Sequence, residues 1–147
     1  LKAATVFQGV YTGDGADLSP NIKAFRVLWA SPQAAALFGA LSKEGTVVGR
    51  LYGAVGLYRF DPAQFESAAE SLRKIAKEDV EVHFGCKVGS FTVGFLLEPD
   101  LPAVRLEPGQ TLAQWSEANK HPKTLDIVGG GYTGEFAGEH EVPRLAR

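Results

Sequence analysis

The sequence predicts an α+β fold in which N-terminal helices pack on an antiparallel sheet. A helix-capping residue precedes proline at Ser19-Pro20, Ser31-Pro32 and Asp61-Pro62, and this pairing is typical of a helix N-terminus. After the third of these sites, apolar residues recur every three to four positions, as on one face of a helix. Over about 79–98 they alternate with polar residues instead, which is typical of strands.

A chain of 147 residues is long enough for one hydrophobic core, and we predict a single domain over residues 1–147 with a glycine-rich tail at 129–147. Hydrophobic residues make up 45% and charged residues 22%, which excludes a disordered or fibrous chain. The formal net charge of -2 gives no basic surplus for binding nucleic acid or an anionic membrane. No stretch approaches the ~18 apolar residues that a membrane-spanning helix needs. A single cysteine excludes an internal disulfide and a cysteine-based zinc or iron–sulfur site.

The N-terminal half is predicted as one strand followed by helices. β-Branched and aromatic residues indicate a strand over Thr5–Thr12. The helix that starts at Ser31 runs to about Lys43 and stops at Gly45. The helix that starts at Asp61 has one apolar face, which is formed by Phe65, Ala68, Ala69, Leu72, Ile75 and Ala76.

Residues 46–58 between these two helices are ambiguous. Their apolar residues have helical spacing, but Gly49, Gly53 and Gly56 each weaken a helix by roughly 1 kcal/mol relative to alanine. The spacing of these glycines puts them on one side of a helix. We expect that side to be a small-residue face against which a neighbouring element packs closely.

The alternation over about 79–98 predicts a hairpin with the two-residue turn Gly89-Ser90. Folding about this turn brings apolar residues together on one face, as the pairs Val88 with Phe91, Cys86 with Val93, Phe84 with Phe95 and Val82 with Leu97. This face must turn toward the core. The free thiol of Cys86 then behaves as a small buried hydrophobe.

The opposite face of this hairpin is the candidate binding surface. Gly85 opposite Gly94 leaves a gap without side chains, and glycines in a sheet indicate that another group approaches closely. That group is either a helix or aromatic ring of the same chain, or a ligand or partner. The candidate binding residues, which form and frame the gap, are His83, Gly85, Lys87, Thr92, Gly94 and Leu96.

We expect no catalytic residue, no metal site and no cofactor. His83 and Cys86 are three positions apart in a strand and point to opposite faces, so they do not form a thiol–imidazole pair. His121 or His140 could still reach the thiol, and nothing in the sequence shows that either does. The three histidines have no metal-ligand spacing.

The C-terminal third is predicted to contain a short helix over Thr111–Asn119 and a last strand over Thr124–Val128. Gly129, Gly131 and Gly134 then match the glycine pattern of a dinucleotide-binding turn. No uninterrupted helix follows them, so a phosphate group would lack the helix N-terminus that binds it. A turn is the simpler interpretation of these glycines.

Two runs, Ser-Pro-Gln-Ala-Ala-Ala at 31–36 with Leu41, and Gly-Arg-Leu-Tyr-Gly-Ala-Val-Gly-Leu-Tyr at 49–58, precede Asp61, Phe65 and Gly85-Cys86. This pattern covers about residues 24–90 and resembles small exported proteins of unknown function from myxobacteria and planctomycetes. The resemblance implies a bacterial origin, an envelope location and a helix at the Gly-Arg-Leu-Tyr-Gly segment. It implies no activity and no catalytic residues.

We therefore expect a non-enzymatic interaction or structural module of the bacterial envelope or extracellular space, as a protein-binding unit or a subunit of a larger assembly. Nine Phe, four Tyr and two Trp supply enough aromatic residues for a contact surface as well as a core. The alternative is a small-molecule-binding or enzymatic domain that uses His83 or Cys86. A toxin-neutralising or inhibitor protein also fits the size and the mild acidity.

The chain begins with Leu1 and contains no methionine, so we expect either that a leader or a tag has been removed or that the sequence begins inside a longer protein. Together with the resemblance, this favours a periplasmic or extracellular protein. A cytoplasmic protein is the alternative.

Overall fold

The computed structural model describes residues 1–12, 18–85, 87–97, 99–100 and 121–122 of the chain. Within them a strand and four helices come first, followed by a hairpin, a short helix and two short strands. In chain order the elements are β1 (Val6–Thr12), α1 (Pro20–Trp29), α2 (Ala34–Glu44), α3 (Val47–Phe60), α4 (Pro62–Arg73), β2 (Asp79–Gly85), β3 (Lys87–Thr92), α5 (Val93–Leu97), β4 (Pro99–Asp100) and β5 (His121–Pro122). The predicted α+β class is confirmed. None of these helices has the length and apolar character that crossing a membrane requires.

The three strands β1, β2 and β3 form one sheet in that order, and this sheet is mixed. β2 and β3 are antiparallel, but β1 runs parallel to β2, with Phe7 opposite Val82. The helices α1 to α4 lie between β1 and β2 in the chain and provide the crossover that parallel neighbours need. The prediction of a purely antiparallel sheet is therefore wrong. β4 and β5 form a separate two-stranded antiparallel sheet.

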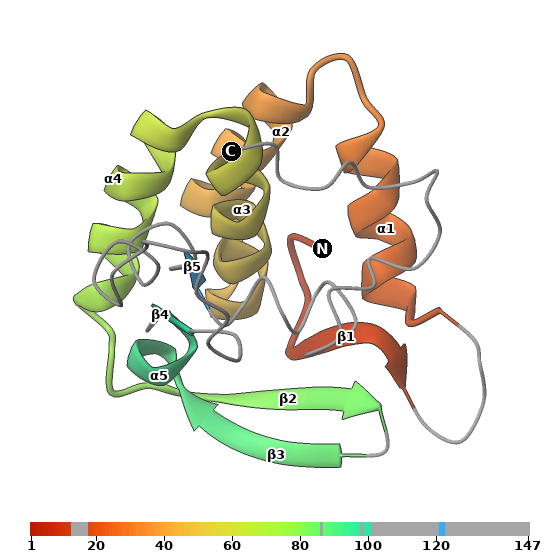
Figure 1. Cartoon of the computed structure of the whole chain (residues 1–147), viewed down its shortest axis with the longest axis vertical. Helices are drawn as coiled ribbons and strands as arrows, with labels where there is room; N and C mark the ends of the chain where they lie inside the picture. Colours follow the sequence, from red (N-terminus) through yellow and green to blue (C-terminus); the bar gives the residue numbers. More distant parts are fainter. Residues whose placement is uncertain (13–17, 86, 98, 101–120, 123–147) are drawn as a thin grey trace, which may run out of the picture.

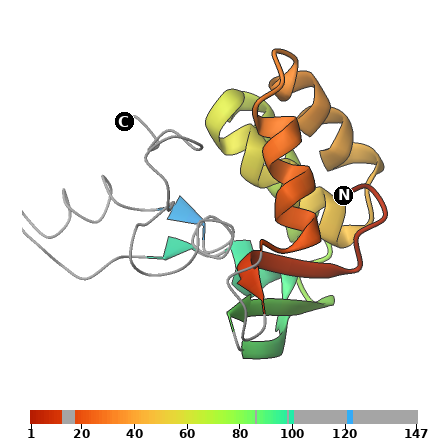
Figure 2. The same ribbon diagram turned by 90° about the vertical axis from the view of Figure 1, so that its right-hand side faces the viewer.

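The sheet meets the helices at β1 (Figure 1). β1 lies next to α1 and α3, and β3 is the strand farthest from the four large helices; a view turned by 90° gives the same order (Figure 2). Phe7, Val80 and Val82 are buried, whereas Asp79 and Glu81 are exposed. One face of the sheet therefore belongs to the core, and the other face is open.

The hairpin turns four residues earlier than predicted. β2 ends at Gly85 and β3 begins at Lys87. The predicted turn residues Gly89 and Ser90 lie inside β3 instead, paired with residues of β2. The predicted register of the hairpin is therefore wrong, while the prediction that Cys86 is buried falls outside the described residues.

The predicted second strand of the hairpin turns into helix α5. Val93, Leu96 and Leu97 are buried, and their spacing of three and four residues suits one side of a helix rather than one face of a strand. The N–H of Gly94 donates to the carbonyl oxygen of Ala76 at 2.9 Å. This contact joins α5 to the segment that follows α4.

Two of the three predicted helix starts are confirmed. The Ser19 hydroxyl accepts a hydrogen bond from the N–H of Ile22 and caps α1. The Asp61 carboxylate accepts one from the N–H of Gln64 at 3.0 Å and caps α4. The hydrogen bonds from the Gln64 backbone and side chain lower the pKa of Asp61 because they stabilise its charged form.

The helix that was predicted to start at Ser31 begins later, because the Ser31 side chain stabilises a turn instead of capping the helix. The Ser31 hydroxyl accepts a hydrogen bond from the N–H of Gln33, and the Ser31 carbonyl accepts one from the N–H of Ala34. α2 then begins at Ala34, without a side-chain cap. Its predicted end at Gly45 is confirmed.

The ambiguous segment is helix α3, and two of its three glycines, Gly53 and Gly56, face α2 as expected, whereas Gly49 lies against the backbone of Leu1 and Lys2. A Cβ atom at Gly53 would lie 2.5 Å from the backbone nitrogen of Ser42 in α2. A Cβ atom at Gly56 would overlap the ring of Phe38, which is also in α2. The two helices therefore pack with their backbones close together.

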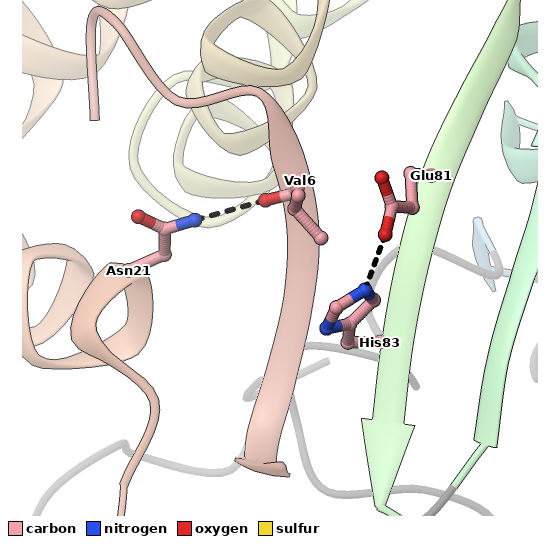
Figure 3. Close-up of polar contacts among 4 residues, drawn as sticks. All are labelled: Val6, Asn21, Glu81 and His83. Carbon is pink, nitrogen blue, oxygen red and sulfur yellow. Dashed lines mark hydrogen bonds and ion pairs between the residues drawn. The ribbon is translucent and has the colours of Figure 1, made fainter.

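The hydroxyl group of Tyr52, in the middle of α3, connects the helices to β1. It donates a hydrogen bond to the carbonyl oxygen of Gln8 at 2.8 Å and accepts one from the N–H of the same residue at 2.7 Å. The Asn21 side chain donates to the carbonyl oxygen of Val6 at 2.8 Å (Figure 3). Burial of Tyr52 raises the pKa of its hydroxyl group, because the charged form would lose its solvation.

We predict that Gly53→Ala destabilises the protein although alanine favours a helix. The helix would gain about 1 kcal/mol from alanine, but the new methyl group meets backbone atoms of α2, and such overpacking costs typically about 1–3 kcal/mol. Chemical denaturation measures the free energy of unfolding. Gly39→Ala in α2 is the matched control, because its methyl group meets only the end of the flexible Gln64 side chain. Equal effects of the two substitutions would contradict the close backbone contact.

We predict that Tyr52→Phe lowers the free energy of unfolding at pH 7 by about 2 kcal/mol, because both backbone groups of Gln8 lose their partner. The raised pKa of Tyr52 also gives a sign for the pH dependence. Its stabilisation is complete below the ordinary tyrosine pKa of about 10 and is lost as the pH rises above it. The wild-type protein should therefore lose stability between pH 9 and 11 more steeply than Tyr52→Phe.

Denaturation curves at pH 7, 9 and 11 provide this measurement. Tyr58→Phe is the control, since it removes a hydroxyl group from a half-buried ring that packs on Phe65 rather than on β1. A loss at pH 7 that is as large for Tyr58→Phe as for Tyr52→Phe would refute the special role of the Gln8 contact.

Candidate functional site

The structure does not assemble the predicted binding surface as the sequence suggested. The six candidate residues divide among three elements, with His83 and Gly85 in β2, Lys87 and Thr92 in β3, and Gly94 and Leu96 in α5. Gly85 was predicted to lie opposite Gly94 but lies opposite Thr12 of β1. Within the hairpin, His83 lies opposite Val88, Lys87 opposite Phe84, and Thr92 opposite Asp79. None of the six candidates is therefore paired with another. The face they were predicted to share therefore does not exist in that form.

The two residues in α5 pack inside the protein. Leu96 is fully buried. A Cβ atom at Gly94 would lie 3.1 Å from the carbonyl oxygen of Ala76, so a segment of the same chain occupies the space above this glycine. Internal packing thus explains Gly94. A binding role for the other four candidates stays a prediction.

His83 contacts a carboxylate on the open face of the sheet. Its Nε2 atom lies 2.6 Å from Oε1 of Glu81, two residues earlier in β2 (Figure 3). A carboxylate bonded to a ring nitrogen orients an imidazole ring; in catalytic triads that nitrogen is Nδ1, whereas here it is Nε2. Within the described ranges, no group of three or more His, Cys, Asp or Glu side chains is placed to hold a metal ion.

The predicted alternatives that involve other histidines are not tested. Cys86 and His140 fall outside the described residues. His121 lies in β5, opposite Asp100. A thiol–imidazole pair between Cys86 and a distant histidine therefore stays a prediction.

The hydrogen bonds of the hairpin determine which backbone groups of β3 point away from β2. The N–H of Val93 donates to the carbonyl oxygen of Glu78 at 2.8 Å. In an antiparallel ladder every second pair exchanges hydrogen bonds, so Phe91 bonds to β2 in the same way. The N–H and C=O groups of Val88 and Ser90, which lie between the bonded pairs, point outward.

These outward groups lie on an open strand edge. In the described part of the chain, β3 has β2 as its only strand neighbour. No hydrogen bond among the same residues reaches the outward backbone groups of Val88 and Ser90. An edge strand of this kind can pair with another extended chain.

Apolar side chains are exposed on both faces of this strand. Val88 points to the open face of the sheet, opposite His83, and is 67% exposed. Phe91 points to the other face, opposite Val80, and is 39% exposed. The ring of Phe91 stacks on that of Phe95 in α5, with the ring centres 5.2 Å apart and an angle of 17° between the planes.

We use the term β3 edge for the outward backbone groups of Val88 and Ser90 together with the side chains of Val88 and Phe91. This feature was not predicted from the sequence, because the predicted register placed Val88 and Phe91 opposite each other in the core. The signal that could have revealed it is a second Gly-X dipeptide, Gly85-Cys86, which suits a two-residue turn as well as Gly89-Ser90 does.

Charge on the open face lies mainly in β2. Asp79 and Glu81 are exposed there, and the residues opposite them in β3 are Thr92 and Ser90. Side chains on this face of β3 are therefore small and uncharged next to a row of carboxylates. The comparisons with known proteins add no function to this geometry, since no family model, no curated protein and no solved structure gives a significant match to the chain.

Proposed function

We propose that the protein is a non-enzymatic interaction module that binds an extended segment of a protein partner at the β3 edge. The observation that carries this proposal is the exposure of apolar side chains on both faces of a strand that also has outward backbone groups. A partner lying flat on one face would cover either Val88 or Phe91. A strand added beside β3 would cover both and would pair with the backbone as well.

The contrast with β1 supports this interpretation. β1 is the other edge of the sheet, where the Asn21 side chain donates to the Val6 carbonyl and the Tyr52 hydroxyl bonds both backbone groups of Gln8. Proteins generally protect strand edges, because an open edge pairs with other chains. The chain thus protects the β1 edge with side chains of its helices but leaves apolar residues exposed at the β3 edge. This difference fits a protein that binds a partner at the β3 edge.

The resemblance to exported bacterial proteins supports a location in the envelope or the extracellular space. That location belongs to the proposal and rests on the sequence pattern.

A ligand-binding or enzymatic role for His83 is the second candidate. Its contact with Glu81 at 2.6 Å favours it, because that contact fixes the orientation of the imidazole ring. The two candidates predict different effects of substitution. His83→Asn should abolish a catalytic role but leave a partner at the β3 edge bound.

We predict that the double substitution Val88→Ser with Phe91→Ser lowers retention of a protein partner at least about tenfold, since exposed apolar anchors carry much of the affinity of an interface. The immobilised wild-type and variant proteins are compared for the partner that each retains from an extract of the native source. A photoreactive side chain at position 88 then identifies the partner segment that lies against β3.

The matched control is Val27→Ser, because Val27 is 72% exposed but lies on α1, away from the β3 edge. It should retain the partner within about twofold of the wild-type protein. Circular dichroism and thermal unfolding verify that each variant is folded. Retention that depends on Val27 but not on Val88 and Phe91 would contradict the proposed function.

A further inference from the structure

The two faces of the β3 edge make different demands on an added strand. On the face that is turned toward the core, the side chain of β3 that an added strand would meet is the ring of Phe91, which stacks on the ring of Phe95. The ring also covers Gly89, where a Cβ atom would lie 3.2 Å from Cε2 of Phe91. A residue of the added strand next to this ring lies on an apolar surface, so an apolar side chain fits there.

The open face makes the opposite demand. Neighbouring strands are about 4.8 Å apart, so an added strand would lie about 10 Å from β2. The intervening side chains of Ser90 and Thr92 are short, and beyond them stand the exposed carboxylates of Glu81 and Asp79. The flexible four-carbon stem of a lysine, or the longer arginine side chain, can cross this row and place its charge near the carboxylates.

The contact between Glu81 and His83 does not prevent Glu81 from attracting a basic side chain of the added strand. The His83 ring touches Oε1 of Glu81, and a carboxylate has a second oxygen that can accept from a cation. Asp79 lies two residues further along the same face. The row therefore carries two acidic side chains that face the same side of the sheet.

Successive residues of a strand point to opposite faces. Resting on the proposed function, we infer that the partner segment bound at the β3 edge is an extended strand in which basic residues alternate with apolar residues. The apolar residues lie beside Phe91, the basic residues lie beside Ser90 and Thr92, and the aliphatic stem of a basic side chain covers Val88 on the same face. Backbone pairing with Val88 and Ser90 holds the segment in place.

The test uses the full chain and three synthetic nine-residue peptides with blocked ends. One peptide alternates lysine with valine, the second alternates glutamate with valine, and the third has the composition of the first with its lysines and valines in two separate blocks. Binding is measured by titration at low salt. Amide hydrogen exchange followed by NMR reports where each peptide binds.

We expect the lysine–valine peptide to bind at least about tenfold more tightly than either other peptide. It should slow exchange at the amides of Val88 and Ser90, which point outward, because a new strand would take up their hydrogen bonds. Glu81→Gln combined with Asp79→Asn should remove most of the preference for lysine over glutamate. Raising the salt concentration should reduce the same preference, because exposed charges are screened.

Ser90→Pro separates strand pairing from simple contact with the apolar side chains. Proline at position 90 removes only an outward N–H and leaves the hydrogen bonds to β2 intact, so the hairpin should fold. It should abolish peptide binding, whereas Ser90→Ala, which keeps the N–H, should bind as the wild-type protein does. Phe91→Ser should weaken every peptide.

Several results would overturn the inference. Equal affinity for the three peptides would refute the alternation of basic and apolar residues, and protection at amides outside β3 would refute the position. A stable dimer of the chain that Ser90→Pro dissociates would assign the edge to a second copy instead. If no peptide binds while retention of the native partner still depends on Phe91, this inference fails and the proposed function stands. If retention does not depend on Phe91, the proposed function itself fails.

Discussion

The contact between the Tyr52 hydroxyl and the backbone of Gln8 determines how the helices and the sheet are arranged. The central turns of α3 are buried and place the Tyr52 hydroxyl at the outward edge of β1. There the hydroxyl forms hydrogen bonds with both the N–H and the C=O of Gln8. Leaving such groups unpaired in a buried place costs about 1–3 kcal/mol each. α3 can be this deeply buried because Gly53 and Gly56 let α2 approach it closely. The packing of α3 therefore positions β1, and β2 and β3 are positioned in turn by their pairing with β1.

This arrangement makes the two edges of the sheet different. The β1 edge lies against α1 and α3 and is closed by side chains, whereas β3 is two strands away from those helices (Figure 1). The helices α1 and α3 therefore do not close the β3 edge, and within the described ranges its nearest helical neighbour is the short α5. Exposed Val88 and Phe91 are the result of this geometry. The proposed partner strand would extend the sheet at this edge, away from α1 and α3.

Local features of the fold could be predicted from the sequence, and distant ones could not. Ser19 and Asp61 cap helices through hydrogen bonds to residues three positions later, so their neighbours in sequence reveal them. Ser31 has the same pattern, but its hydroxyl bonds two residues ahead and forms a turn. The parallel direction of β1 depends on where four helices return the chain. No short segment carries that information.

The β3 edge could not be predicted from the sequence, because turns at Gly85-Cys86 and at Gly89-Ser90 both fit the alternation of apolar and polar residues. Turning at Gly89-Ser90 would bury Val88 and Phe91, and burial of an apolar side chain contributes about 1.5–3 kcal/mol. Turning near Gly85 leaves them exposed, and α5 then places Leu96 in the core together with Val93 and Leu97, which the predicted register also turned inward. The observed turn leaves two apolar side chains on a strand edge. Val88 and Phe91 remain in contact with water in this arrangement, so the packing that specifies the hairpin also creates the surface at which we propose that a partner binds.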